Sequence, residues 1–392
     1  MTSTRCILPW IHQYGDIEGS YGLCCFTLAK KGSLFGKGKR PLDAFNDDAI
    51  KKARLDMLSG KKVDACSVCY DWEDQGIDSH RIRMNNKFLS YENLYNKTNP
   101  DGSVKNPPIY LDFRFGNLCN FSCRMCGSYA SSSWVKEDKH FKRIAKNSPA
   151  HYDFWTNNDE FWEDIDKIKS YIKVLYFAGG EPFVQVGHYK LLQFLIDNKC
   201  TDIELSYNTN LSYNNTFKNY DIESMWSCFK KVELWPSIEG YKEKAEYGRK
   251  GLDWSLFVSN SKRFEKYISS FSIVSNIFSI TSNMDLIKWI KRNNKNFSIT
   301  NLVNPPHMST TILSNKIKKQ IINNYKSDLL LLYEDLTSYE LNSILDSLKN
   351  MRSKNDYLLA CTFKKSNYDS DVFRGESFEK IYPELSEWYS NI

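Results

Sequence analysis

The chain has 392 residues, of which 41% are hydrophobic, 26% charged and 15% aromatic. This length and composition allow a large hydrophobic core and about two domains, and they exclude an intrinsically disordered chain. The formal net charge of +6 is small for the length, so it gives no strong signal for nucleic-acid binding.

The start of the chain lacks the pattern of a targeting segment. Residues 1–18 contain no sustained apolar run, and Asp16 and Glu18 are acidic, so we expect no signal peptide. The longest apolar runs, such as 329–333, are too short to span a bilayer, so we expect no membrane span. The expected location is a reducing cytoplasm, where clustered cysteines more often bind metal or do chemistry than form disulfides.

Residues 1–98 are expected to form a small α+β domain that carries cysteines. Gly19 and Gly22 permit the sharp turns of a hairpin. Such a hairpin would bring Cys6 close to Cys24.

A helix is expected next, with Asn46 as its N-cap and Gly60 at its end. Asp47 and Asp48 would stabilise the positive end of the helix dipole. Apolar residues recur along this segment at the spacing of one helix face.

Cys66 and Cys69 are separated by two residues, so they can reach one metal centre from a single turn of chain. Together with Cys6 and either Cys24 or Cys25 they make a plausible set of four thiolates. Zinc and iron both accept four thiolates in a tetrahedral arrangement. The spacing therefore leaves a structural zinc site and an iron–sulfur cluster open.

The stretch 96–108 is rich in proline, glycine and asparagine, so we place a domain boundary there. A core domain is expected over 109–314, and a helical extension over 315–392 that packs on the core or acts as a lid. Within this extension Asp371 and Arg374 are expected to form an ion pair. The core alternates strands with helices, and its apolar, β-rich runs are typical of interior parallel strands. We expect strands at 109–116, 173–178, 203–208, 231–236, 271–277 and 298–303, and helices between them, for example at 187–197, 253–268 and 284–293.

Three cysteines follow the first of these strands at a CxxxCxxC spacing: Cys119, Cys123 and Cys126. Thiolates this close can hold one cubane iron–sulfur cluster, but a four-iron cluster usually takes four cysteines. One iron would stay open for a substrate or cofactor, as in catalytic rather than structural metal sites. Buried free cysteines, or part of a zinc site, are the alternative interpretations.

Polar and glycine residues follow the later strands. Gly179, Gly180 and Glu181 come after the second strand, and adjacent glycines let the backbone approach a ligand closely. Asn208 and Asn210 end the third strand, where short amides could bind ribose hydroxyls, and an asparagine-rich turn is the alternative interpretation.

The fourth strand ends in Ser237, followed by Glu239. Arg249 lies a little further along, and its planar guanidinium is well matched to a carboxylate. A surface position is the alternative interpretation for this arginine.

The CxxxCxxC motif and the Gly-Gly-Glu segment together resemble the signature of the radical S-adenosylmethionine (radical SAM) enzymes. The resemblance implies an α/β fold with a partial (β/α)6 barrel of the TIM type, whose chemistry lies at the carboxyl ends of the strands. It implies a [4Fe–4S] cluster on the three cysteines that cleaves SAM reductively to a 5′-deoxyadenosyl radical, which abstracts a substrate hydrogen. It implies SAM contacts by Gly179, Gly180, Glu181, Asn208, Asn210, Ser237 and Arg249.

Two residues depart from the pattern of this family. Glu239 stands where the family's Ser-x-Asp-Gly has Asp, and Met125 stands where many relatives have an aromatic residue. Methionine is apolar and polarisable, so it can take the aromatic residue's place.

The amino-terminal pattern of Cys6, Gly19-x4-Cys24, a helix and Cys66-x2-Cys69 resembles the twitch domain, the shortened relative of the SPASM domain. The resemblance implies an auxiliary [4Fe–4S] cluster on these four cysteines. In many relatives this domain follows the barrel, whereas here it precedes it.

Modification of peptides or proteins is frequent among relatives with such domains. The resemblance therefore favours a peptide or protein substrate, and it implies an electron donor such as flavodoxin or ferredoxin. The alternative function is a non-catalytic protein that binds zinc or an iron–sulfur cluster, or transfers electrons.

Overall fold

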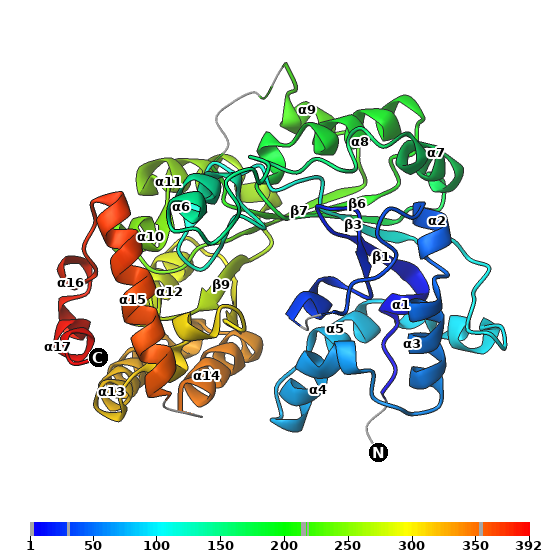
Figure 1. The fold of residues 1–392 in the computed structure, drawn as a ribbon. Coiled ribbons are helices and arrows are strands. Elements are labelled where there is room, and N and C mark those ends of the chain that lie inside the picture. Colours follow the sequence, from blue (N-terminus) through cyan, green and yellow to red (C-terminus); the bar gives the residue numbers. More distant parts are fainter. Residues whose placement is uncertain (1–3, 30–31, 213–216, 218, 353–355) are drawn as a thin grey trace. The chain divides into compact units, whose positions relative to one another are not determined.

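The computed structural model describes residues 4–29, 32–212, 217, 219–352 and 356–392 (Figure 1). It is a mixed α/β fold whose central six-stranded sheet has the order β2-β1-β3-β5-β6-β7. A parallel pair, β9 and β10, and an antiparallel pair, β4 and β8, complete the named strands. The strands are β1 (His12–Gly15), β2 (Tyr21–Gly22), β3 (Tyr110–Phe113), β4 (Ser122–Cys123), β5 (Val174–Phe177), β6 (Glu204–Thr209), β7 (Lys231–Pro236), β8 (Arg249–Lys250), β9 (Phe271–Ser275) and β10 (Phe297–Asn301).

All six strands expected after residue 109 are confirmed, as β3, β5, β6, β7, β9 and β10. β3 pairs in parallel with β5, with Leu111 opposite Leu175. The amino-terminal segment adds a strand to the same sheet, because β1 also pairs in parallel with β3. All four residues of β1 are buried, which is typical of an interior strand covered on both faces.

The chain divides into two compact units. The first unit comprises Met1–Leu118, His151–Ser206 and Asn215–Val232, and the second comprises Cys119–Ala150, Tyr207–Asn214 and Glu233–Ile392. The division therefore falls within strands β6 and β7. The domain limits 1–98, 109–314 and 315–392 stay a prediction, and these units do not coincide with them.

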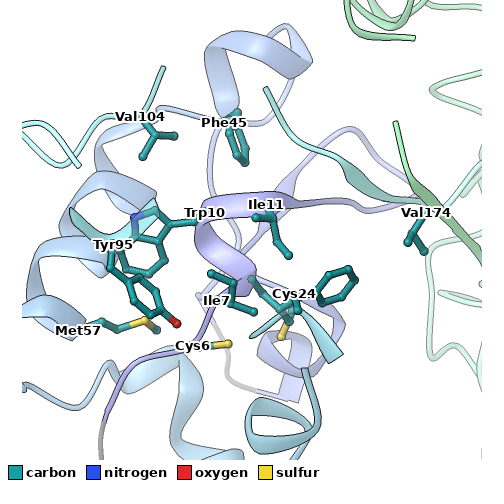
Figure 2. Close-up of a cluster of buried hydrophobic side chains, with 12 residues drawn as sticks. Cys6, Ile7, Trp10, Ile11, Cys24, Phe45, Met57, Tyr95, Val104 and Val174 are labelled. Atoms are coloured by element: carbon teal, nitrogen blue, oxygen red, sulfur yellow. The ribbon is translucent and has the colours of Figure 1, made fainter. Parts of the chain in front are cut away.

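The first unit is built around a hydrophobic cluster of its amino-terminal part (Figure 2). The fully buried Trp10 packs edge-on against Tyr95, with ring centroids 4.9 Å apart. The indole Nε1 of Trp10 donates to Oγ1 of Thr98 at 2.7 Å, so its polar atom is satisfied inside the core. The α-helices of this unit are α1 (Leu8–Ile11), α2 (Pro41–Ala44), α3 (Asp48–Leu58), α4 (Ser67–Asp74), α5 (His80–Lys87), α7 (Asp159–Ile168), α8 (Val186–Asp197) and α9 (Ile222–Trp226).

The expected N-cap of α3 is wrong by one residue. Asp47 is the N-cap, and its carboxylate accepts from the backbone N–H of Ala49 at 2.9 Å. Asn46 is engaged elsewhere, because its Oδ1 accepts from Nη1 of the buried Arg54 at 2.8 Å. The helix therefore begins one residue later than its sequence suggests.

The second unit contains the carboxyl-terminal helices, so the prediction of a helical segment after residue 315 is confirmed. Within this unit two isolated parallel bridges link Leu234 of β7 to Ile268, and Ser237, the residue after β7, to Ser272 of β9. Its α-helices are α6 (Val135–His140), α10 (Glu243–Gly248), α11 (Trp254–Arg263), α12 (Asn283–Arg292), α13 (Asn315–Leu332), α14 (Ser338–Arg352), α15 (Tyr357–Arg374), α16 (Phe378–Ile381) and α17 (Ser386–Ser390).

The expected ion pair between Asp371 and Arg374 is wrong. Asp371 instead pairs with Arg124 at 2.6 Å, and Arg374 pairs with Glu137 at 2.8 Å. Both side chains turn from α15 toward buried partners that lie far away in the sequence. A buried charge is stable only when it is paired and hydrogen-bonded, so these partners outweigh a contact along the helix.

Gly60 and Gly102 both have a left-handed backbone, but they differ in the space available for a side chain. Replacing each with alanine distinguishes backbone strain from steric collision. A Cβ at Gly60 (φ +79°) would meet no atom within 4 Å, whereas at Gly102 (φ +87°) it would collide with the backbone of Lys51. We expect Gly60→Ala to lower the free energy of unfolding by about 1 kcal/mol. Gly102→Ala should lower the free energy of unfolding clearly more, because the added Cβ would also collide with the Lys51 backbone. Urea unfolding of both variants measures the two losses. Equal losses would contradict the close approach of the backbones at Gly102 and Lys51.

Candidate functional site

The three cysteines of the CxxxCxxC motif lie in the second unit, on the loop that contains β4. Cys123 ends β4 and is paired with Arg249 of β8. The loop is compact, because the backbone N–H of Cys126 donates to the carbonyl oxygen of Cys123 at 2.9 Å. The backbone N–H of Phe121 points at Sγ of Cys119 at 3.4 Å. One short turn therefore carries all three thiols.

A buried ion pair stands beside this loop. Arg249 binds Glu239 with both ends of its guanidinium, Nε to Oε2 at 2.5 Å and Nη2 to Oε1 at 2.9 Å. Its third nitrogen, Nη1, lies 3.8 Å from Sγ of Cys123. Sequence analysis singled out both residues but did not pair them; the expected contact of Arg249 with a cofactor carboxylate stays a prediction.

The charges of Arg249 and Glu239 affect the pKa of the Cys123 thiol. Burial alone would lower the pKa of Arg249, but the Glu239 carboxylate and the neighbouring Cys123 raise it above its ordinary value. The guanidinium therefore stays cationic. Burial raises the pKa of Cys123, and Arg249 opposes that rise. A cation at this position favours the thiolate, which is the form of cysteine that binds metal.

The predicted polar residues near the ends of β6 and β7, namely Asn208, Asn210 and Ser237, belong to the second unit. Nδ2 of Asn210 donates to Oδ1 of Asn120 at 2.9 Å, which connects the end of β6 to the cysteine loop. Asn208 is half-buried, and so is Ser237, whose backbone N–H donates to the carbonyl oxygen of Thr209 at 2.8 Å. The structure thus brings Asn210 to the loop, while SAM contacts of all three predicted residues stay a prediction.

The Gly-Gly-Glu segment lies in the first unit, directly after β5. Gly179 and Gly180 both have left-handed backbones, with φ of +77° and +60°. A Cβ at Gly180 would collide with the carbonyl oxygen of Leu118 and with the side chain of Gln185, so this position requires glycine. The backbone N–H of Glu181 donates to that same Leu118 oxygen at 2.9 Å.

Two side chains support this turn: Glu181, which sequence analysis singled out, and Gln185, which it missed. Nε2 of Gln185 donates to the carbonyl oxygen of Gly179 at 2.6 Å. The buried carboxylate of Glu181 accepts from the backbone N–H of Phe183 at 3.2 Å and caps the short helix that follows. Gln185 stands only a few residues after the glycines, yet nothing in its local sequence indicates that its amide turns back to them.

A buried ion pair, Arg114 with Asp112, lies next to the Gly179 turn. Arg114 follows β3, and a Cβ added at Gly179 would lie 2.7 Å from Cδ of Arg114. Nε of Arg114 lies 2.8 Å from Oδ1 of Asp112, and Nη2 donates to Oδ2 at 2.9 Å. Burial raises the pKa of Asp112 to about 6, and Arg114 opposes the rise. The sequence predicts both residues only as part of the strand at 109–116.

The four amino-terminal cysteines predicted as ligands lie together in the first unit. The expected hairpin is confirmed, since β1 and β2 pair antiparallel with Gly19 in the left-handed region between them. Figure 2 shows the sulfur atoms of Cys6 and Cys24 in the same buried cluster. One small cavity is lined by Cys6, Cys24, Cys66, Cys69 and apolar neighbours, together with His80 and Arg81.

The structure also distinguishes the two adjacent cysteines. Cys24 lines the cavity, whereas the thiol of Cys25 is affected chiefly by burial and by the charges of Asp112 and Arg114. Burial raises the pKa of Cys6 to about 12, so this thiol is neutral at physiological pH in the absence of metal. A metal that binds here would have to displace protons.

The donor chemistry fits thiolate-bound metal at both places, with three sulfurs in one set and four in the other. Within the described ranges, no three or more histidine, cysteine, aspartate or glutamate side chains are arranged to hold a single metal ion. Thiolates around a cubane cluster stand farther apart than thiolates around one ion. The metal assignments therefore stay predictions, supported by the nature of the donors.

A larger pocket of about 800 Å³ opens beside the four-cysteine cavity in the first unit, and Arg81 lines both. The guanidinium of Arg81 pairs with Glu73 and is almost completely buried. Amide and charged side chains predominate in the pocket wall, which includes Arg5, Glu73, Asp78, Asn85, Asn86, Glu92, Asn93 and Asn96.

No protein-family model matches this chain, and no curated protein matches it. Its fold is similar to three solved structures of SuiB from Streptococcus suis. The structure bound to S-adenosylmethionine is 15% identical with a TM-score of 0.41, and the match covers 69% of this chain and 60% of that chain. The structure bound to the precursor peptide SuiA is 16% identical with a TM-score of 0.38, covering 73% and 64%. A third SuiB structure is 14% identical with a TM-score of 0.39, covering 82% and 68%.

This chain therefore spans less than two thirds of the first two SuiB structures. These values describe a distant likeness, and the function proposed below is argued from the residues of this chain. Among the helices that the structure describes, none has the length and apolar character needed to cross a membrane.

The raised pKa of Asp112 predicts a pH-dependent stability. The folded carboxyl titrates near pH 6 and the unfolded one near 3.8, so the folded chain holds an extra proton between these values. The stabilisation is complete below about pH 4 and is lost as the pH rises through about 6, with an upper limit of about 3 kcal/mol. When urea unfolding is measured at several pH values in this range, the difference in stability between the wild type and Asp112→Asn should change with pH. A constant difference for Asp112→Asn would contradict the prediction.

Proposed function

We propose that this chain is a radical SAM enzyme. Cys119, Cys123 and Cys126 would hold a [4Fe–4S] cluster, and SAM would bind at its open iron. The observation that carries the proposal is the loop with three thiols, where the cationic Arg249, paired with buried Glu239, stands 3.8 Å from Cys123. Three thiolates leave one iron of a cubane without a protein ligand.

When bound and reduced, the cluster would supply the electron that cleaves SAM to methionine and a 5′-deoxyadenosyl radical, which abstracts a substrate hydrogen. The protein residues would bind and orient the groups. Arg249 would offset negative charge at Cys123, because Glu239 holds its guanidinium against the loop. Such charges and hydrogen bonds at cluster sulfurs are among the factors that set a cluster's reduction potential.

We propose that the turn after β5 binds the methionine part of SAM. Gly179 and Gly180 leave the backbone free of side chains, and Gln185 keeps the turn in one conformation. Asn208, Asn210 and Ser237 would contact the rest of the nucleotide. The partial (β/α)6 barrel belongs to the same proposal. Its support is that β3 pairs in parallel with β5 and β9 pairs in parallel with β10. Two isolated parallel bridges, Leu234 to Ile268 and Ser237 to Ser272, add to it.

We further propose an auxiliary [4Fe–4S] cluster on Cys6, Cys24, Cys66 and Cys69. The support is that all four line one buried cavity in the first unit. A structural zinc ion is the alternative occupant, since it accepts the same four thiolates.

A peptide or protein is the proposed substrate. Besides the family resemblance, the pocket beside Arg81 supports this choice. The exposed side chains of Asn86, Asn93 and Asn96 in its wall carry both a donor and an acceptor, so they can bind the N–H and C=O groups of a peptide backbone. A flavodoxin or ferredoxin stays the predicted electron donor.

SAM cleavage tests the proposed class directly. We expect protein reconstituted with iron and sulfide under anaerobic conditions to form 5′-deoxyadenosine when dithionite and SAM are added. Cys123→Ala should form none above background, because a ligand of the cluster is lost. The matched control Cys228→Ala, an exposed cysteine, should retain the activity. Iron-loaded wild type without 5′-deoxyadenosine would favour the alternative, a non-catalytic metal-binding or electron-transfer protein.

Metal analysis tests the auxiliary site. Two four-iron clusters give about eight irons per chain. We expect the double variant Cys66→Ala/Cys69→Ala to retain about four and still cleave SAM. Cys25→Ala should retain the wild-type content, because Cys24 and not Cys25 lines the cavity. Zinc in the wild type that disappears from the double variant would show the structural zinc site instead.

A further inference from the structure

One residue of the CxxxCxxC motif that is not a cysteine, Arg124, is anchored by α10 and by the carboxyl-terminal helix α15 of the same unit. The side chain of Arg124, next to Cys123, is only 1% exposed. Its Nε donates to the carbonyl oxygen of Tyr247 at 3.2 Å, and Nη1 donates to Oδ1 of Asn367 at 2.8 Å. Its Nη2 lies 2.6 Å from a carboxylate oxygen of both Asp371 and Glu376.

These partners fix the guanidinium in one position. The aromatic ring of Tyr247 lies with its centroid 3.7 Å from Cζ of Arg124, a cation–π contact. Asp371 is itself held, because it accepts from the hydroxyl of Tyr247 at 2.8 Å and from the backbone N–H of Phe378 at 2.7 Å. Moving the loop would separate Arg124 from Asp371 and Glu376, and of these three groups Glu376 alone would keep another oppositely charged partner, Lys250, among the residues that the structure describes. Buried charges without an oppositely charged partner are costly.

A second arginine, Arg374 at the end of α15, holds the loop at Ser122, just before Cys123. Nη1 of Arg374 donates to the carbonyl oxygen of Ser122 at 2.9 Å, while Nε binds Glu137 at 2.8 Å. The guanidinium of Arg374 also lies over the ring of Trp134, 4.5 Å from a ring centroid. The indole of Trp134 donates to the carbonyl oxygen of Cys123 at 2.9 Å. Backbone on both sides of the central cysteine is therefore fixed.

We infer that α15 is a clamp on the cysteine loop, and that Arg124 and Arg374 are positioning residues for Cys123 and Cys126. The carboxyl-terminal helices are then part of the cluster-binding site, in place of the packing element or lid that the sequence suggested. Arg124 acts on the cluster only through the loop that carries its ligands. This inference rests on the proposed function, because it takes this loop to be the cluster loop.

Hydrogen exchange in the full-length, metal-free protein tests the clamp without a cluster. We expect backbone amides of residues 119–127 to exchange about ten times faster in Arg124→Met than in the wild type, because the loop opens locally. Arg124→Lys should be intermediate, since an ammonium keeps the charge but not the fork of donors. The exposed Arg292→Gln, on α12, is the matched control and should match the wild type. Wild-type exchange rates in Arg124→Met would overturn the inference.

The reconstituted protein gives the second measurement. We expect Arg124→Lys and Arg374→Gln to bind iron but to require more SAM than the wild type to change the electron paramagnetic resonance spectrum of the reduced cluster. Unchanged SAM dependence in both variants would overturn the positioning role. If Arg124→Met does not fold, these two milder variants decide the question by both measurements. If the wild type binds no cluster at this loop while the exchange difference is present, the proposed function fails and the clamp alone stands.

Discussion

The pairing of buried guanidinium and carboxylate groups is the constraint on which the cysteine loop depends. The pair of Arg249 and Glu239 lies beside Cys123. The next residue, Arg124, is anchored by its pair with Asp371. Each charged group is stable in the interior only because its partner is held in place by further hydrogen bonds. The loop is thereby held in a single conformation before any metal binds, which favours a site whose ligands do not have to be ordered on binding.

The two proposed metal sites share an electrostatic pattern, because each combines buried thiols with one arginine. Arg249 lies 3.8 Å from Sγ of Cys123, and Arg81 lines the cavity of the four amino-terminal cysteines. Burial raises the pKa of Cys126 and of Cys6 to about 12, and the arginine of each site opposes the rise. Charge near a cluster sulfur and exclusion of water both tune reduction potential, so both factors are present at each site.

The resemblance to radical SAM enzymes depends on short motifs, and the structure adds the side chains that hold them. Gln185 binds the backbone at Gly179, and Arg114 lies beneath the same glycine. Neither residue belongs to the motif. Both restrict the turn to the conformation in which only glycine fits, so they supply the rigidity that a backbone-binding site needs.

Local patterns in the sequence were sufficient for the six strands, the carboxyl-terminal helices and the grouping of Cys6 with Cys24, because periodicity and turn residues act over a few neighbours. The tertiary structure decided the contacts of charged and polar side chains. The N-cap of α3 is Asp47 and not the expected Asn46, because the side-chain oxygen of Asn46 accepts a hydrogen bond from Arg54. Arg124 and Asp371 are 247 positions apart, and no local pattern connects residues at that separation. A buried charged side chain pairs with whichever opposite charge lies near it in the folded chain, and the sequence alone does not reveal which residues become neighbours.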